Sequence, residues 1–411
     1  MRIAAGARAY IAIVGGGITG GALARVLALG GLSILLLERQ LEYRDQVRGE
    51  ILWPWGVRVL RQLGLEETLR AGGAQIVNRF DFYDEGTSGA EAVDLPAAVA
   101  GIEGSLNVRH PSACAALTDA ARTAGAAVRM GVQHVEVTAG KQPHVRWSEG
   151  DGTRDARPRL IVGADGRRSA VRSQARIAFE LDPPAHLIAG MLVEDVPRLD
   201  EDMNVMAREA DVIFYSFPQQ GGQSRLYFCF PTKQRSRFAG PGGPARFLAE
   251  SNLRCLEGVA DWAAAVQAGP CATFPGEDSR APNPMAEGVV LIGDAAGYEN
   301  PLQGQGLAMA MQDVFEVSET LLEDSLSEVD LSAYGTRRAT RQRLANIGTA
   351  LEVWTTEGCI VPDPAERAAR SEYIAADELL AQLAVCFMTG FDALPQDLTH
   401  SDLAGRLAAY G

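Results

Sequence analysis

The segment from residue 10 to residue 38 constrains the fold of this chain more than any other. It begins with a short apolar run, Tyr10 to Val14, of the kind that forms a parallel strand buried on both faces. Glycines follow, and apolar residues then recur at helical spacing as far as Leu29. A second apolar run, Ser33 to Leu37, ends in Glu38. The segment is therefore predicted to form a βαβ unit with two parallel strands.

The glycines of this unit have the spacing of a dinucleotide-binding turn. Gly15, Gly17 and Gly20 match the pattern G-x-G-x-x-G between the strand and the helix. Such glycines allow a tight turn and a close approach of the backbone to a pyrophosphate, whose charge the helix N-terminus favours. Glu38, at the end of the second strand, would accept hydrogen bonds from the adenosine ribose. The pattern favours FAD or NAD over NADP, and over a purely structural turn.

Two later segments repeat this design. The runs Leu160 to Gly166 and Val289 to Asp294 are both apolar and both end in glycine and aspartate. Because the carboxyl ends of strands in an open α/β sheet meet at the ligand crevice, three such ends predict one long ligand rather than three sites. The glycine-rich stretch from Gly293 to Gly306 predicts that the backbone comes close to this ligand.

The remaining segments differ in pattern. Residues 176–275 are dominated by runs typical of strands, whereas helical spacing prevails after residue 307 and includes a stretch from Asp363 to Phe387. With 411 residues, the chain is long enough for two closely joined domains.

The composition excludes several classes of partner. A net charge of −14 would repel a phosphate backbone, so no nucleic acid partner is expected. The six cysteines contain no CxxC pair and the five histidines form no cluster, which favours reduced thiols and no metal site. No apolar run is long enough for a membrane span or a signal peptide. We expect a cytoplasmic protein, and the sequence carries no signal for its oligomeric state.

In order and spacing, these motifs resemble those of the class A flavoprotein monooxygenases, the para-hydroxybenzoate hydroxylase-like family. The resemblance covers about residues 10–345 and includes the segment Gly163 to Arg172 around Asp165-Gly166. It implies an α/β fold in which a Rossmann-like FAD-binding domain is interrupted by a β-sheet-rich substrate domain and followed by C-terminal helices. The implied boundaries are 1–70, 105–175 and 276–345 for the FAD-binding domain, 71–104 and 176–275 for the substrate-binding domain, and 346–411 for the C-terminal helical segment.

The resemblance also implies roles for single residues. Asp294 would hydrogen-bond the ribityl chain of FAD, and Asp165 would belong to a motif linked to FAD and the nicotinamide donor. Arg48 and Arg109 look like the arginines that contact FAD in this family. Simpler interpretations remain open, namely a turn cap for Asp165 and a solvated loop charge for Arg48. The expected FAD-binding residues are Gly15, Gly17, Gly20, Glu38, Arg39, Arg48, Arg109, Asp165, Asp294, Pro301, Gly304 and Gly306.

The chemistry implied by the resemblance is a monooxygenase reaction. NAD(P)H reduces FAD, O₂ adds to the flavin C4a carbon, and the distal oxygen of the hydroperoxide is transferred to a small-molecule substrate. The GxSxG and P-loop patterns are absent, so we expect no single indispensable protein base. Two alternatives are an FAD-dependent reductase or dehydrogenase that inserts no oxygen, and a non-catalytic flavin-binding regulatory protein.

The candidates for contact with substrate are mostly aromatic, which favours a hydrophobic, aromatic or polycyclic substrate. Tyr215 and Phe217 share one strand face, and Phe228 lies on the next strand. An aromatic stripe of this kind also fits an ordinary core. Trp53 and Trp55 flank a proline on a loop that the resemblance puts near the flavin, and suit pocket and core equally.

Two further candidates lie in the glycine-rich stretch. The resemblance puts Asn300 where the flavin ring meets the substrate. Many family members have histidine at the position of Gly297, which Tyr298 follows in this chain. We expect Tyr298 to make a structural contact at the cofactor rather than to act as a catalytic acid.

Overall fold

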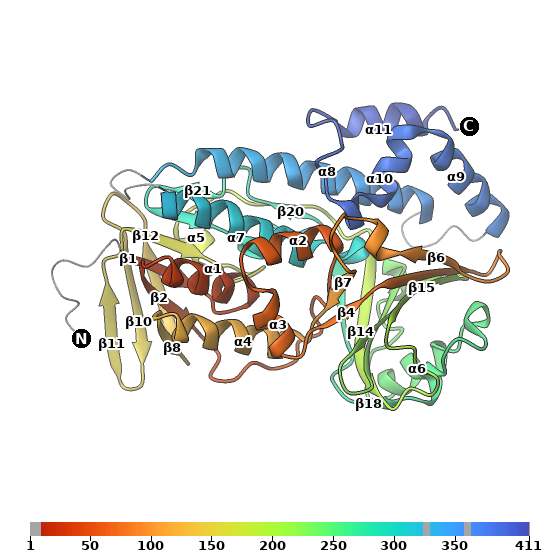
Figure 1. Cartoon of the computed structure of the whole chain (residues 1–411), viewed down its shortest axis with the longest axis horizontal. Coiled ribbons are helices and arrows are strands. Elements are labelled where there is room, and N and C mark those ends of the chain that lie inside the picture. The colour runs from red at the N-terminus through yellow and green to blue at the C-terminus, as the bar shows by residue number, and fades with distance from the viewer. Residues whose placement is uncertain (1–9, 324–328, 357–362, 411) are drawn as a thin grey trace.

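The computed structural model describes residues 10–323, 329–356 and 363–410 (Figure 1). Within these ranges the chain forms a mainly parallel sheet with helices, a second and larger sheet, and a group of C-terminal helices. This arrangement confirms the predicted fold class. The N-terminal residues before Tyr10 and one of the six cysteines, Cys359, lie outside the described residues.

The mainly parallel sheet has six strands in the order β21-β22-β12-β1-β2-β8. Neighbouring strands are parallel from β22 to β8, and only β21 runs antiparallel to its neighbour. The strands are β1 (Tyr10–Val14), β2 (Ser33–Glu38), β8 (Ala127–Met130), β12 (Leu160–Gly163), β21 (Met285–Ala286) and β22 (Val289–Leu291).

Both faces of this sheet are buried, which explains its continuous apolar runs. Ile11 and Ile13 of β1 belong to the core shared with α1 (Ile18–Leu29) and α4 (His110–Thr123). Ala12 and Val14 point to the opposite core, which includes side chains of a three-stranded sheet. That sheet and the helix beside it are β9 (Gln133–Thr138), β10 (His144–Glu149), β11 (Gly152–Ala156) and α5 (Ala170–Gln174).

The larger sheet has the order β18-β14-β17-β16-β15-β5-β6, with β19 also paired to β14. Only the β15–β5 pair is parallel. One face is covered by α6 (Gly243–Glu250), and the other faces the loop that contains Leu302. The strands are β5 (Arg79–Asp84), β6 (Glu91–Asp94), β14 (His186–Glu194), β15 (Met203–Glu209), β16 (Val212–Gln219), β17 (Gln223–Phe230), β18 (Val266–Gln267) and β19 (Ala272–Gly276).

Short elements connect the two large sheets. A small sheet has the order β3-β7-β4, and a further pair is formed by β13 and β20. These strands and the two helices between β3 and β4 are β3 (Ile51–Leu52), α2 (Pro54–Gln62), α3 (Glu66–Ala71), β4 (Gln75–Val77), β7 (Ser105–Asn107), β13 (Glu180–Leu181) and β20 (Ser279–Arg280). The large sheet thus receives strands from two separate stretches of chain, while the exact domain boundaries remain a prediction.

The C-terminal part of the chain is helical, and α8 runs from the parallel sheet toward the larger sheet (Figure 1). The helical stretch predicted from Asp363 to Phe387 is wrong in one respect, because the structure has two helices there. Asp377 has an extended backbone, and its carboxylate accepts hydrogen bonds from the backbone N–H groups of Leu379 and Leu380, which starts a new helix. The helices are α7 (Gly306–Glu323), α8 (Ser332–Thr356), α9 (Pro364–Ala376), α10 (Glu378–Thr389) and α11 (His400–Leu407).

None of the helices within the described ranges combines the length and the apolar character that a bilayer crossing requires.

A buried ionic network joins α7 and α8 to the end of the parallel sheet. The carboxylate of Asp313 on α7 lies 2.9 Å from both Arg338 and Arg341 of α8. Asp313 also accepts a hydrogen bond from the backbone N–H of Gly293 at 2.8 Å. The side chains of Asp313 and Arg338 are only 1% and 3% exposed. Removing one partner from such a buried pair leaves an uncompensated charge.

We predict that Arg338→Met lowers the free energy of unfolding by about 3 kcal/mol, because buried Asp313 then loses one of its two arginine partners. Urea unfolding of the purified protein measures this change. The control is Arg337→Met, one residue earlier on α8, whose side chain is 49% exposed and should cost less than about 1 kcal/mol. Equal losses in the two variants would show that the buried network has no special weight.

Candidate functional site

The glycine turn after β1 is required by close packing on one side and is open on the other. A Cβ atom on Gly15 would lie 2.3 Å from the carbonyl oxygen of Ala164, and one on Gly20 would lie 1.9 Å from the carbonyl oxygen of Gly15. At Gly17, the residue before α1, a Cβ atom would meet nothing within 4 Å. The first N–H groups of α1 are therefore approachable by a ligand, and the helix dipole favours an anionic one.

Glu38 lies beside this turn at the end of β2. Its carboxylate accepts hydrogen bonds from the backbone N–H groups of Gly16 at 2.6 Å and Gln40 at 2.7 Å. A carboxylate has about four acceptor positions, so both oxygens can still accept from ribose hydroxyls. Tyr43 and Thr118 both donate to the carbonyl oxygen of Gly16, which fixes the turn against α4.

Three of the predicted FAD-binding residues are arginines whose side chains remain available to bind phosphate. Within the described ranges, Arg39, Arg48 and Arg109 form neither a hydrogen bond nor an ion pair through their side chains. Partial burial lowers the pKa of Arg48, and the negative charge of Asp294 nearby opposes this shift while Arg167 adds to it. Unpaired guanidinium groups close to a helix N-terminus fit the charge of a pyrophosphate.

The second aspartate segment has a local structural function that is visible in the structure. One oxygen of Asp165 accepts from the hydroxyl of Ser169, and the other accepts from the backbone N–H groups of Ala170 and Val171. Asp165 therefore caps the start of α5, as the simpler interpretation of this residue expected. Its link to FAD and the nicotinamide donor stays a prediction.

Asp294 lies in the short 3-10 helix η5 (Gly293–Ala295) that follows β22. It is half-buried, and one of its oxygens lies 3.4 Å from the Nε atom of Arg167. The other oxygen has no partner in the described part of the chain, so it is free to accept from a ribityl hydroxyl.

Tyr298 holds Arg167 in place. The Tyr298 side chain is 6% exposed, and its hydroxyl donates to Glu277 at 2.6 Å. The guanidinium of Arg167 lies over the Tyr298 ring, 4.5 Å from its centroid. Burial and the hydrogen bond to Glu277 raise the pKa of Tyr298 to about 12, so the hydroxyl stays protonated at neutral pH. This geometry fits a structural function for Tyr298, whose ring contacts Arg167, which in turn lies beside Asp294.

The preceding residue, Gly297, cannot carry a side chain in this backbone. Its φ angle is +141°, and a Cβ atom would lie 2.6 Å from the carbonyl oxygen of Ser279. The histidine that many family members have here is therefore incompatible with this loop.

The rest of the loop leads to a second open helix N-terminus. Asn300 accepts from the backbone N–H of Leu302 and its own N–H donates to Asp278, which sets up the 3-10 helix η6 (Pro301–Gln303). A Cβ on Gly304 would lie 3.1 Å from Ile51 of β3 and 3.3 Å from the Trp53 ring, whereas a Cβ on Gly306 would meet nothing within 4 Å. The N-terminus of α7, like that of α1, is thus open to a ligand.

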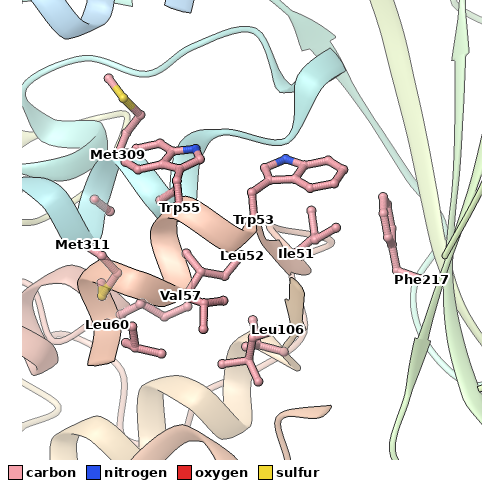
Figure 2. Close-up of a cluster of buried hydrophobic side chains, with 14 of the residues drawn as sticks. Ile51, Leu52, Trp53, Trp55, Val57, Leu60, Leu106, Phe217, Met309 and Met311 are labelled. Carbon is pink, nitrogen blue, oxygen red and sulfur yellow. The ribbon is translucent and has the colours of Figure 1, made fainter. Parts of the chain in front are cut away.

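Six aromatic side chains form a cluster between this loop, β3 and the inner face of the large sheet. Figure 2 shows Trp53 and Ile51 on one side and Phe217 on the other. Ring centroids are 5.3 Å apart for Trp53 and Phe80, 4.8 Å for Trp53 and Phe387, and 6.2 Å for Phe217 and Tyr227. We call this set the aromatic cluster: Trp53, Phe80, Tyr215, Phe217, Tyr227 and Phe387.

Two predicted substrate contacts lie elsewhere. Phe228 is on the opposite face of the large sheet, packed against Phe238 and Phe247 beneath α6, which corrects its placement as a pocket residue. Trp55 is buried against Phe391, and its indole N–H donates to the carbonyl oxygen of Phe387. Both side chains are part of the core.

The sequence analysis missed a group of buried polar and charged residues around Glu50, two residues after Arg48. The Glu50 side chain is fully buried, 3.1 Å from Arg225, and it accepts from Gln219 at 2.7 Å. Arg225 also pairs with Asp45 at 2.7 Å. His110 lies near Arg48, and burial lowers the pKa of His110 to about 4. These residues come together only in the folded chain, and no sequence motif predicts their contact.

Within the described residues, no group of three or more His, Cys, Asp or Glu side chains is placed to hold a metal ion.

Comparison with known proteins decides the family. The model of the family described as FAD binding domain matches residues 8–345. The chain belongs to this family. Squalene monooxygenase SE2 of Panax ginseng is 26% identical over 99% of this chain and 76% of its own length. Squalene monooxygenase of Mus musculus is 24% identical over 82% of this chain and 60% of its own length. Rifampicin monooxygenase of Streptomyces venezuelae is 29% identical over 75% of this chain and 62% of its own length.

Solved structures share the fold. The p-nitrophenol 4-monooxygenase PnpA from Pseudomonas putida DLL-E4 matches with a TM-score of 0.76 at 18% identity, over 93% of this chain and 97% of that one. The flavin-dependent halogenase CmlS has the same TM-score of 0.76 at 16% identity, over 99% of this chain and 78% of that one. The resemblance to class A flavoprotein monooxygenases is thereby confirmed, and the chain is an FAD-dependent monooxygenase.

We predict that Arg48→Ala weakens FAD binding about tenfold to a hundredfold, because one charged contact to the pyrophosphate is lost. Titration of the apoprotein with FAD, followed by flavin fluorescence, measures the affinity. Arg44→Ala removes the same charge from the same loop without touching the arginine that lies near Asp294, and should change the affinity little. If both variants bind FAD like the unmodified protein, Arg48 is only a solvated loop charge.

A second prediction concerns Tyr298. Tyr298→Phe keeps the ring beneath Arg167 and should leave the FAD affinity within about twofold, whereas Tyr298→Ala removes the ring and should weaken FAD binding several-fold. The same fluorescence titration distinguishes the two. A Phe variant that binds FAD but consumes NAD(P)H without forming product would mean that the hydroxyl participates in the reaction.

Proposed function

We propose that this monooxygenase uses NAD(P)H and O₂ to insert oxygen into a hydrophobic small molecule, aromatic or polycyclic in character. FAD is proposed to bind along the glycine turn, the three unpaired arginines and the loop from Asp294 to Gly306. When bound there, FAD would supply the transfer of one oxygen atom from O₂ to the substrate.

The observation that carries the substrate class is the hydrogen bonding of the aromatic cluster. The indole N–H of Trp53 donates to the carbonyl oxygen of Gln303 at 2.7 Å, and the hydroxyl of Tyr215 donates to that of Leu302 at 2.9 Å. The hydroxyl of Tyr227 is directed to Glu50 at 3.3 Å. Because these polar atoms are already engaged within the protein, the cluster offers a substrate rings and apolar edges. A charged substrate would lose its hydration there without compensation.

The protein residues contribute binding, orientation and exclusion of water rather than a proton-transfer group. The backbone carbonyls of residues 302 and 303, in the loop from Asp294 to Gly306, accept hydrogen bonds from Tyr215 and Trp53 of the aromatic cluster. The proposed cofactor-binding loop and the proposed substrate-binding residues are therefore in direct contact. This link supports a substrate position next to the flavin. It fixes the orientation of the substrate, on which transfer of an oxygen atom depends.

NAD(P)H is proposed as the electron donor because the segment around Asp165-Gly166 is intact and well ordered by the α5 cap. The exposed Arg168 in this segment offers a cation to the phosphates of a dinucleotide. The expected cytoplasmic location remains a prediction, as does the choice between NADH and NADPH.

We predict that the purified protein is yellow and that apolar aromatic or polycyclic compounds raise its rate of NAD(P)H oxidation at least several-fold, whereas their carboxylated analogues do not. Reaction under ¹⁸O₂ should place one labelled oxygen atom in the product. Stimulation by the charged analogues alone would overturn the substrate class. Turnover without ¹⁸O incorporation would favour the reductase or dehydrogenase alternative.

A cyclase is a second candidate, and a specific relative favours it. Dialkyldecalin synthase of Streptomyces rugosporus is 29% identical over 74% of this chain and 63% of its own length. Ring closure without a change of oxidation state would consume neither O₂ nor NAD(P)H. Product formation under anaerobic conditions without a reductant separates it from the proposed monooxygenase.

A further inference from the structure

Glu299 is a buried acid for which the proposed reaction has no use. It lies between Tyr298 and Asn300 in the loop that joins η5 to η6, and it is 5% exposed. Its Oε1 atom is buried and has no hydrogen-bond partner in the described part of the chain. An ionised carboxylate in this position would lose its hydration at one oxygen without compensation, and the neutral acid largely avoids that cost.

The charges that face Glu299 do not favour its ionisation. Arg338 on α8 is the nearby cation, but its guanidinium already donates to Asp313, to Gln342 and to backbone carbonyls of the loop. Asp278 and Asp294 lie close enough to raise the pKa of Glu299 by repulsion. A further negative charge at Glu299 would therefore meet two acids and one cation that is already paired.

The neighbouring strands add little positive charge at Glu299, because Arg280 on β20 already pairs with Glu180 and Asp182. His186 on β14 is buried next to Asn300, and burial lowers the pKa of His186 to about 4, so its ring is neutral at pH 7. Burial raises the pKa of Glu299 to about 8 and that of Asp278 to about 6. Glu299 is thus expected to be mostly protonated at neutral pH.

The position of Glu299 gives its charge state a consequence for the cofactor. The loop that contains it begins at Asp294 and ends at the open N-terminus of α7, whose dipole favours negative charge on a ligand. Reduction adds negative charge to a flavin, and a carboxylate in this loop would oppose the effect of the helix.

We propose that Glu299 is an electrostatic positioning residue for bound FAD: its neutral side chain keeps negative charge away from the N-terminus of α7, and loss of its proton makes reduction of the flavin harder. The inference rests on FAD occupying the site proposed above. It assigns no contact between Glu299 and the substrate or the reacting oxygen.

The first test is the reduction potential of bound FAD from about pH 6 to about pH 9.5. Unmodified protein and Glu299→Gln should have the same potential near pH 6, and above about pH 8 the unmodified protein should have the more negative one. Glu319→Gln removes an exposed acid from α7 itself and should follow the unmodified protein at every pH. Coincident curves for unmodified protein and Glu299→Gln would overturn the inference.

The second test is the stability of the apoprotein and needs no cofactor. Because the pKa of Glu299 is raised in the folded state, the carboxyl stays protonated there while it ionises in the unfolded chain. The stability of the unmodified protein should therefore fall as pH rises from about 5 to about 8, relative to Glu299→Gln, and the difference should become independent of pH near pH 4. Urea midpoints across this range measure it, even if the variant fails to hold FAD.

The outcomes separate the two proposals. Protein that cannot be reconstituted with FAD would refute the proposed function. Yellow protein whose potential is unaffected by Glu299→Gln would refute the electrostatic function of Glu299 and leave the proposed function standing. A Glu299→Gln variant that is less stable than the unmodified protein at pH 7 would show that Glu299 is an ionised partner of Arg338, which also overturns the inference.

Discussion

The packing of the C-terminal helices against the parallel sheet depends most on the interactions of the Asp313 carboxylate. It binds the backbone of Gly293 at the end of the parallel sheet and pairs with Arg338 and Arg341 of α8. The turn that presents Asp294 is therefore held by the same atoms that fix the C-terminal helices. Because Asp313 and its arginine partners are buried, these ion pairs tolerate little displacement, and the loop that begins at Asp294 is correspondingly rigid.

The parts of the fold that the sequence predicted well are those determined by local contacts. Gly20 is required by a clash with Gly15 within a single turn, and the apolar run of β1 reflects two buried faces. Each such signal lies within a few residues. The site residues near these turns, such as Glu38, follow from the same short-range geometry.

The remaining features depend on contacts between distant segments. Trp53 and Phe387 meet only after the C-terminal helices have docked, and Phe228 faces away from Phe217 because of strand register, which an aromatic stripe alone does not reveal. The unpaired oxygen of Glu299 likewise results from packing of three elements. Burial of this kind leaves no pattern in the residues next to it.

The contact between Trp53 and Phe387 shows that the proposed cofactor-binding residues and the aromatic cluster occupy different parts of the sequence. Every residue expected to bind FAD lies before residue 307, whereas the aromatic cluster is complete only when α10 has been synthesised and packed. The residues expected to bind FAD therefore all precede the last member of the aromatic cluster in the sequence. Under the proposed function, substitution of Phe387 on α10 would alter the aromatic cluster without changing any residue expected to bind FAD.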